Sequence, residues 1–167
     1  MGGTVSIEPI TRRYALVFKA VRLRALQDAP TAFGSTYAQT ARLTDDDWRR
    51  RAEEWNGERS ASFLAMDAGA PCGMVGCFLD REDPARAHLV AMWVAPTHRR
   101  TGVGRDLVDT VGDWARAKGV RDVRLTVTSN NDSAIGFYRA LGFAFTGATQ
   151  PYPNDPDLAE HEMIRPV

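Results

Sequence analysis

The stretch that decides the fold covers residues 92–105 and reads Met92-Trp93-Val94-Ala95-Pro96-Thr97-His98-Arg99-Arg100-Thr101-Gly102-Val103-Gly104-Arg105. Its first residues close a nearly continuous apolar run over residues 87–94, which is typical of a central strand. Its last residues open the clearest helix pattern of the chain, over residues 102–118, with Gly119 as its stop. A strand therefore leads through a short turn into a helix, which is a unit of a mixed α/β fold.

The turn of this unit has the chemistry of an anion site. Gly102 and Gly104 let backbone N–H groups approach a bound anion closely, and the start of the helix adds unpaired donors and a partial positive charge. Arg99, Arg100 and Arg105 add full positive charges. The segment predicts a site for phosphate or pyrophosphate.

Two nucleotide-binding motifs fit this segment poorly, and an alternative without any ligand stays open. The chain has no Walker G-x-x-x-x-G-K-[ST] loop, and the dinucleotide fingerprint requires a small residue where Leu107 stands. Taken alone, a glycine-containing turn with surface arginines explains the pattern as well as a binding site does.

A second block of sequence supplies an independent signal. It reads Asn130-Asn131-Asp132-Ser133-Ala134-Ile135-Gly136-Phe137-Tyr138-Arg139-Ala140-Leu141-Gly142-Phe143. The pattern R-x-x-G-x-G at residues 99–104 resembles the acyl-CoA motif of the GNAT superfamily of N-acetyltransferases. The second block resembles that family's N-x-x-A-x-x-x-Y-x-x-x-G-F signature, in the expected order along the chain.

The resemblance implies a fold, a cosubstrate and a set of site residues. The fold is a single-domain α/β structure over residues 1–167, with a mixed, mostly antiparallel central sheet flanked by helices. The cosubstrate is acetyl-CoA, and no metal is expected. Backbone groups of Met92, Trp93 and Val94 would pair with the pantetheine arm, and the Asn131 side chain would hydrogen-bond the cofactor. The pyrophosphate would be held by Arg99, Arg100, Thr101, Gly102, Val103, Gly104 and Arg105.

Tyr138 has two interpretations. It lies on the apolar stripe of a short helix expected over residues 133–141, where a tyrosine is more often part of the core. The family motif implies instead that its hydroxyl lies near the thioester sulfur. A phenol has an ordinary pKa of about 10, so it is protonated at neutral pH and can give its proton to a departing thiolate.

The general base departs from the family pattern. Many family members carry a glutamate on the central or fifth strand, and Thr126, on the fifth strand here, cannot serve. His88 stands at the matching point of the central strand, and imidazole is the side chain that titrates near neutrality. We predict His88 as the base, with Glu162 or a structural role for His88 as the alternatives.

The rest of the chain fits the order β-α-α-β-β-β-α-β-α-β-β. Residues 31–42 and 151–160 are expected to be loops beside the acceptor. The remaining strands are expected over residues 5–10, 62–66, 73–79, 123–128, 143–147 and 162–165, and the remaining helices over residues 14–27 and 45–55.

Composition limits the partners. Lys+Arg and Asp+Glu number 21 each, and this balance argues against nucleic acid. No apolar run is long enough to span a bilayer, and residues 1–6 match a myristoylation pattern without a polybasic segment, so we expect no membrane attachment. Cys72 and Cys77 match no zinc or redox motif and are expected to be reduced in a cytoplasmic protein.

These observations predict an acetyl-CoA-dependent N-acetyltransferase. The expected acceptor is the primary amine of a small molecule or, alternatively, a protein N-terminus, attacked directly in a ternary complex. A homodimer is one of the oligomeric states left open. The alternative function is a non-catalytic domain that binds acyl-CoA as a sensor.

Overall fold

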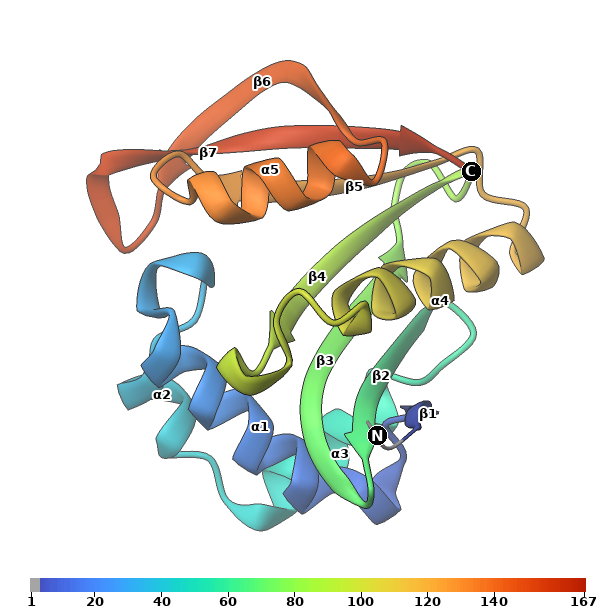
Figure 1. Ribbon diagram of the computed structural model, residues 1–167, viewed down its shortest axis with the longest axis vertical. Coiled ribbons are helices and arrows are strands. Elements are labelled where there is room, and N and C mark those ends of the chain that lie inside the picture. Colours follow the sequence, from blue (N-terminus) through green and yellow to red (C-terminus); the bar gives the residue numbers. More distant parts are fainter. Residues whose placement is uncertain (1–3) are drawn as a thin grey trace.

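The computed structural model describes residues 4–167, so the start of the myristoylation pattern at residues 1–3 lies outside the described residues. Seven strands form one sheet in the order β1-β2-β3-β4-β5-β7-β6 (Figure 1). The strands are β1 (Val5–Pro9), β2 (Ser60–Asp67), β3 (Ala70–Leu79), β4 (Arg86–Val94), β5 (Asp122–Thr128), β6 (Ala144–Tyr152) and β7 (Asp155–Pro166).

Only one pair of neighbouring strands in this sheet is parallel. β4 and β5 pair through Arg86 with Asp122, Ala87 with Val123 and His88 with Arg124, and every other neighbouring pair is antiparallel. Beyond His88 the two strands separate, and Figure 1 shows them diverging. The sheet is therefore mixed and mostly antiparallel, which confirms the expected fold class.

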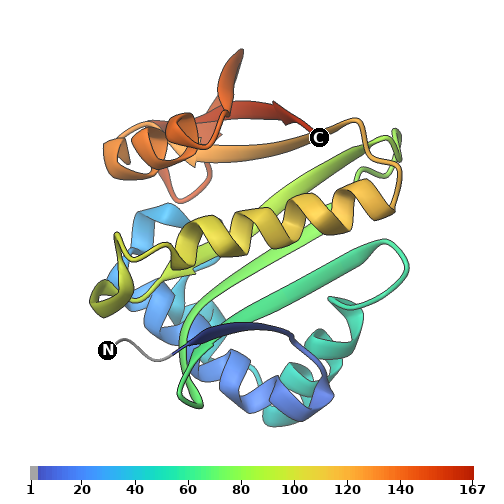
Figure 2. The same cartoon turned by 45° about the vertical axis from the view of Figure 1, so that its right-hand side comes forward.

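Helices cover both faces of the sheet (Figure 2). α4 and α5 pack on one face of the sheet, and α1 and α3 pack on the other. Alternate residues of a strand point to opposite faces, so Val75 contributes to the core under α4 and α5, and Met74 to the core under α1 and α3. The helices are α1 (Ala15–Asp28), α2 (Tyr37–Ala41), α3 (Asp45–Glu54), α4 (Val103–Ala117) and α5 (Asp132–Ala140), with short 3-10 turns at Arg12–Tyr14, Pro30–Ala32 and Pro96–His98. None of the helices within residues 4–167 is both long and apolar enough to cross a membrane.

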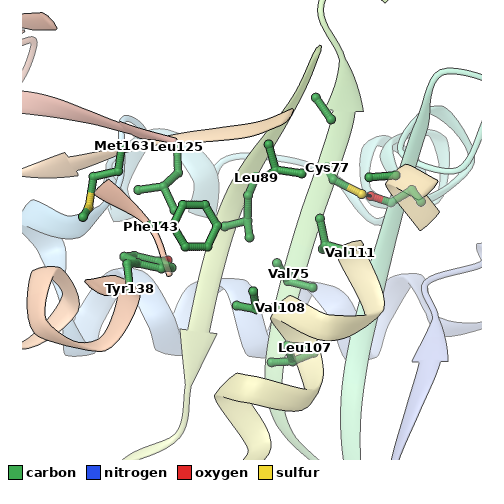
Figure 3. Close-up of a cluster of buried hydrophobic side chains, with 14 of the residues drawn as sticks. Val75, Cys77, Leu89, Leu107, Val108, Val111, Leu125, Tyr138, Phe143 and Met163 are labelled. Atoms are coloured by element: carbon green, nitrogen blue, oxygen red, sulfur yellow. Dashed lines mark hydrogen bonds between the residues drawn. The ribbon is translucent and has the colours of Figure 1, made fainter. Parts of the chain in front are cut away.

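The core below α4 and α5 is continuous. Leu107, Val108 and Val111 point from α4 onto Val75 and Leu89 of the sheet (Figure 3). Burial of this apolar stripe explains why the sequence pattern of α4 was easy to recognise, since a single face carries nearly all its large aliphatic side chains.

The expected loop over residues 31–42 is partly helical. Thr36 and Gln39 form a capping box, in which the Thr36 hydroxyl accepts from the Gln39 backbone N–H at 3.3 Å, and α2 follows. A single-turn helix has too few residues for its periodicity to be recognised in the sequence.

The expected loop over residues 151–160 is also wrong. β6 continues to Tyr152 and β7 begins at Asp155, so a tight hairpin replaces the loop. Pro151 and Pro153 argued against a strand, but β6 is an edge strand, where a residue without a backbone N–H is tolerated.

Candidate functional site

An opening between β4 and β5 dominates the site. Within the described residues β4 has no β5 partner after His88, so residues 89–94 present a free strand edge. Ala91 adopts a left-handed φ of 54°, and the pairing of β4 with β3 shifts register between Met74 and Gly76. This bulge turns β4 away from β5. Met92, Trp93 and Val94, expected to pair with the pantetheine arm, all lie on this edge.

The turn before α4 adjoins that edge. Arg100 and Gly102 adopt left-handed φ values of 61° and 96°, and no side chain caps the helix. Across residues 4–167 no protein acceptor receives a hydrogen bond from the backbone N–H groups of residues 100–105, and the first helical bond runs from Asp106 to the Gly102 carbonyl at 3.0 Å. Free N–H groups at a helix start fit an anion.

The arginines of the turn divide into two kinds. The side chains of Arg100 and Arg105 are exposed beside the turn. Arg99 is held away from it: its Nε donates to the Val94 carbonyl at 3.1 Å and its guanidinium pairs with Asp28. The expected contribution of the Arg99 side chain to the pyrophosphate site stays a prediction, and in this structure the guanidinium is paired with Asp28 of α1.

Asp28 ties the end of α1 to the site. Its carboxylate accepts from Trp93 Nε1 at 3.0 Å as well as from Arg99. The hydrogen bond from Trp93, followed by the contact with Arg99, holds the pKa of Asp28 below its usual value. The Thr101 hydroxyl also donates to the His98 carbonyl, and the His98 ring lies 2.7 Å from Asp67. These contacts fix the turn, and the sequence did not reveal them.

Gly104 is required for a reason other than ligand approach. A Cβ atom here would lie 2.9 Å from Cζ of Phe137 and 3.4 Å from Cε of Met92. The missing side chain lets the start of α4 pack against α5. A larger residue would first displace Phe137, so substitution of Gly104 is a poor test of pyrophosphate binding.

Asn131 is the N-cap of α5. Its Oδ1 accepts from the backbone N–H of Ala134 at 3.2 Å, which leaves the amide NH₂ group and a second lone pair of Oδ1 for a ligand. The expected contact with the cofactor stays a prediction.

Tyr138 lies in the core with only 7% of its surface exposed. Its ring packs edge-on against Phe137 and Phe143, with ring centroids 5.2 and 5.6 Å away. Figure 3 shows the side chain extending from α5 toward β4. Burial raises the pKa of Tyr138 above its ordinary value, and among residues 4–167 its hydroxyl has no hydrogen-bond partner. The phenol is therefore neutral and free to donate.

His88 lies at the last paired position of β4 and β5. Its Nε2 is 2.7 Å from Oδ2 of Asp80, and its ring stacks on Phe78 with centroids 5.0 Å apart. The hydrogen bond with His88 lowers the pKa of Asp80 well below its usual range, with help from two backbone N–H donors.

Two carboxylates on β7 face the same side of the sheet. Glu162 accepts from Arg124 at 2.9 Å, and Glu160 accepts from Gln150 at 2.9 Å. Glu160 pairs with Thr128 at the end of β5, where the opening begins to widen. Sequence reasoning missed Glu160 as a candidate base, although its i, i+2 spacing from Glu162 was the available signal. No group of three potential metal ligands occurs within residues 4–167.

Comparison with known proteins settles the family. The model of the Acetyltransferase (GNAT) family matches residues 23–143, which include the opening, the α4 turn and α5. The chain belongs to the GNAT acetyltransferase family. The resemblance noted in the sequence motifs is thereby confirmed.

Curated relatives are acetyltransferases. Streptothricin acetyltransferase of Streptomyces lavendulae is 48% identical over 71 residues, which are 42% of this chain and 38% of that protein. The IAA acetyltransferase of Azospirillum brasilense is 38% identical over 94 residues, 56% of this chain and 61% of that protein. For the first three curated relatives, the match spans only 38% to 45% of their length.

Solved structures share the whole fold. A GNAT acetyltransferase from Streptococcus pneumoniae superposes with a TM-score of 0.81 at 21% identity, over 98% of this chain and 99% of that one. A GCN5-related N-acetyltransferase from Kribbella flavida reaches 0.76 at 26% identity, over 98% of both chains.

Proposed function

We propose that this GNAT protein transfers the acetyl group of acetyl-CoA to a primary amine of a small molecule. The observation that carries the proposal is the free edge of β4 beside the uncapped turn of α4. An extended amide-containing arm can pair with such an edge as an added strand, while a pyrophosphate meets the N–H groups of residues 100–105.

The chain's residues supply positioning and proton transfer. Bound acetyl-CoA supplies the thioester carbonyl that the amine attacks. As the C–N bond forms and the C–S bond breaks, the Tyr138 hydroxyl holds the proton that the thiolate takes. Both cysteines are buried, and burial raises the pKa of Cys77 to about 12, which supports direct attack without an acyl-cysteine.

The acceptor must lose a proton before it attacks. An amine arrives mostly as ammonium at neutral pH, and its proton passes to a base on the side of the sheet opposite α5. His88, hydrogen-bonded to Asp80, is the base that we propose, with Glu160 and Glu162 of β7 as the alternatives. The relatives named for streptothricin and IAA support a small-molecule acceptor.

Free thiol release from acetyl-CoA with a panel of primary amines tests the proposal. We expect amine-dependent thiol release with at least one amine, and mass spectrometry should find the matching N-acetyl product. Tight CoA binding without amine-dependent release would favour the non-catalytic alternative. Absence of CoA binding would refute both.

A further inference from the structure

A buried arginine stands on the apolar face of α1. Arg22 is only 8% exposed and shares its face with Phe18, Ala25 and Leu26, which belong to the cluster between α1, α3 and the sheet. Its guanidinium carbon lies 4.7 Å from the centroid of the Phe33 ring. Fully buried arginines are rare unless a partner balances the charge.

This arginine has no such partner in the protein. Across residues 4–167, Nη1 of Arg22 is buried without a hydrogen bond, and no carboxylate lies within ion-pair distance. Nε1 of Trp48 on α3 is likewise buried and unpaired. A buried donor without an acceptor costs free energy, and a buried charge without a counter-ion costs more.

A second cation makes the charge imbalance larger. The Arg51 guanidinium lies 5.7 Å from the Trp48 ring centroid and forms no ion pair within the described residues. Burial, and then the like charge of Arg51, lower the pKa of Arg22 to about 10. Arg22 is therefore still charged at neutral pH. Neither Nη1 of Arg22 nor the Trp48 indole N–H has an acceptor among residues 4–167.

Of these residues, Arg51 borders a hollow open to solvent, whose lining includes neither Arg22 nor Trp48. The hollow has a volume of about 240 Å³ and is also lined by Leu43, Asp47, Arg50 and Glu54. The Asp47 carboxylate accepts a hydrogen bond from the Thr44 backbone N–H and pairs with Arg50, so it forms no ion pair with Arg51.

The loop over Arg22 leads toward the opening of the sheet. The Phe33 carbonyl accepts from the Tyr152 hydroxyl at 2.5 Å, and the Thr31 carbonyl accepts from the Thr128 hydroxyl at 2.6 Å, at the end of β5. Phe33 also belongs to the same side-chain cluster as Trp93 of β4.

We propose that Arg22, Arg51 and the Trp48 indole N–H form a binding site for a small carboxylate, with the Phe33 ring as its apolar wall. A carboxylate accepts from two guanidinium groups and neutralises the buried charge. Its source is the acceptor amine, which would then be an amino acid or a similar carboxylate-bearing amine, or a free anion. The first source rests on the proposed acetyltransferase function.

Titration with sodium formate tests the site without any turnover. Melting temperature and the indole N–H resonances are followed in formate and in sodium chloride of equal ionic strength, for the parent, Arg22→Met and the exposed control Arg42→Met. In chloride, Arg22→Met should melt higher than the parent, because an unpaired buried charge is replaced by an apolar side chain.

In formate, the melting temperatures of the parent and of Arg42→Met should rise, and one indole N–H resonance should shift in both proteins. The Trp48→Phe variant, which lacks that resonance, assigns it to Trp48. Arg22→Met should bind formate about 10- to 100-fold more weakly, the loss of a charge-assisted hydrogen bond. An equal response of Arg22→Met and parent, or no response of the parent, overturns the site. If Arg22→Met does not fold, the test of the site rests on formate binding by Arg51→Met and on the shift of the indole resonance in the parent.

Acetyl transfer to amino acids and to their carboxamides separates the two sources. If the acceptor supplies the carboxylate, the parent prefers the acid, and Arg22→Met lowers the preference about 10- to 100-fold while Arg42→Met keeps it. Formate binding without such a preference assigns the site to a free anion. If no amine releases thiol, the proposed function fails and the formate titration alone decides the site.

Discussion

We propose two roles for Tyr138, one in the packing of the core and one as the general acid. Its ring fills the core between Phe137 and Phe143, while its hydroxyl has no partner among residues 4–167. Tyr138→Phe keeps the ring and removes only the hydroxyl. We expect kcat to fall by about 10²- to 10⁴-fold, as for loss of a general acid, with unchanged CoA affinity in calorimetry. A kcat equal to that of the parent would assign Tyr138 to the core alone.

His88 is tested by the pH dependence of kcat/KM. The acidic limb of that profile reports the base of the free enzyme. If His88 is the base, the acidic limb disappears in His88→Gln and persists in Glu160→Gln and Glu162→Gln. Asp80 stays ionised throughout, because its pKa lies far below neutrality. An unchanged limb with full activity in His88→Gln excludes His88 and directs attention to Glu160.

Residues were predictable from the sequence where their environment is local. Tyr138 could be assigned to a helix stripe because its neighbours at i−4 and i+3 are close in sequence. The buried state of Arg22 could have been noticed, since it stands four residues after Phe18 on the same stripe. The partners of Arg99 and His98 could not be predicted from the sequence, because Asp28 and Asp67 are 71 and 31 positions away along the chain.

At the scale of elements, the two exposed arginines of the turn before α4 can be tested separately from the proposed catalytic residues. Arg100 and Arg105 are exposed, so we expect each to contribute to pyrophosphate binding through a screened charge. Arg100→Ala and Arg105→Ala should each weaken CoA binding by about two- to fivefold, with a smaller salt dependence than the parent. Arg116→Ala, near the other end of α4, is the matched control and should bind CoA as the parent does. Equal behaviour of all three variants would remove the turn from the site.

The contacts of Asp28, which link the end of α1 to the same turn, are expected to stabilise the fold. Asp28→Asn removes the carboxylate that holds Trp93 and Arg99, and we expect a loss of about 1 kcal/mol at neutral pH. The pKa of Asp28 is lowered by folding, so its contribution is present above the ordinary aspartate pKa of about 3.9 and is lost as pH falls below it. Urea unfolding at about pH 6 and about pH 3 should therefore show a difference between parent and variant that shrinks in acid. A difference that is constant or grows in acid would contradict this.

Elements were predictable in proportion to their length and periodicity. α4 was recognised because its apolar stripe repeats over four turns, and α3 because Thr44 and three aspartates mark its start. α2 and the full length of β6 and β7 were not recognised, since one turn of helix and a proline-containing edge strand resemble a loop in sequence.

At the scale of the whole molecule, the candidate site lies where the neighbouring strands β4 and β5 are not paired. β4 joins β5 only at its first three residues, and the bulge at Ala91 then separates the strands. Composition and periodicity could indicate the strands but not this separation, because a positive φ at an alanine arises from pairing with β3 and not from local preference. The family resemblance implied that residues 92–94 would pair with the pantetheine arm, and the structure leaves these residues unpaired on the β5 side of β4.

Amide hydrogen exchange with and without CoA tests the central claim most directly. If the arm of CoA lies along the free edge of β4 and its pyrophosphate at the α4 turn, exchange should slow in residues 89–94 and 100–105, while β2, far from the opening, stays as it is without ligand. In the Arg100→Ala, Arg105→Ala double variant, the same protection should require a higher CoA concentration than in the parent, because each substitution weakens CoA binding. Saturating CoA that leaves both segments unprotected, or protects a different edge of the sheet, would contradict the account.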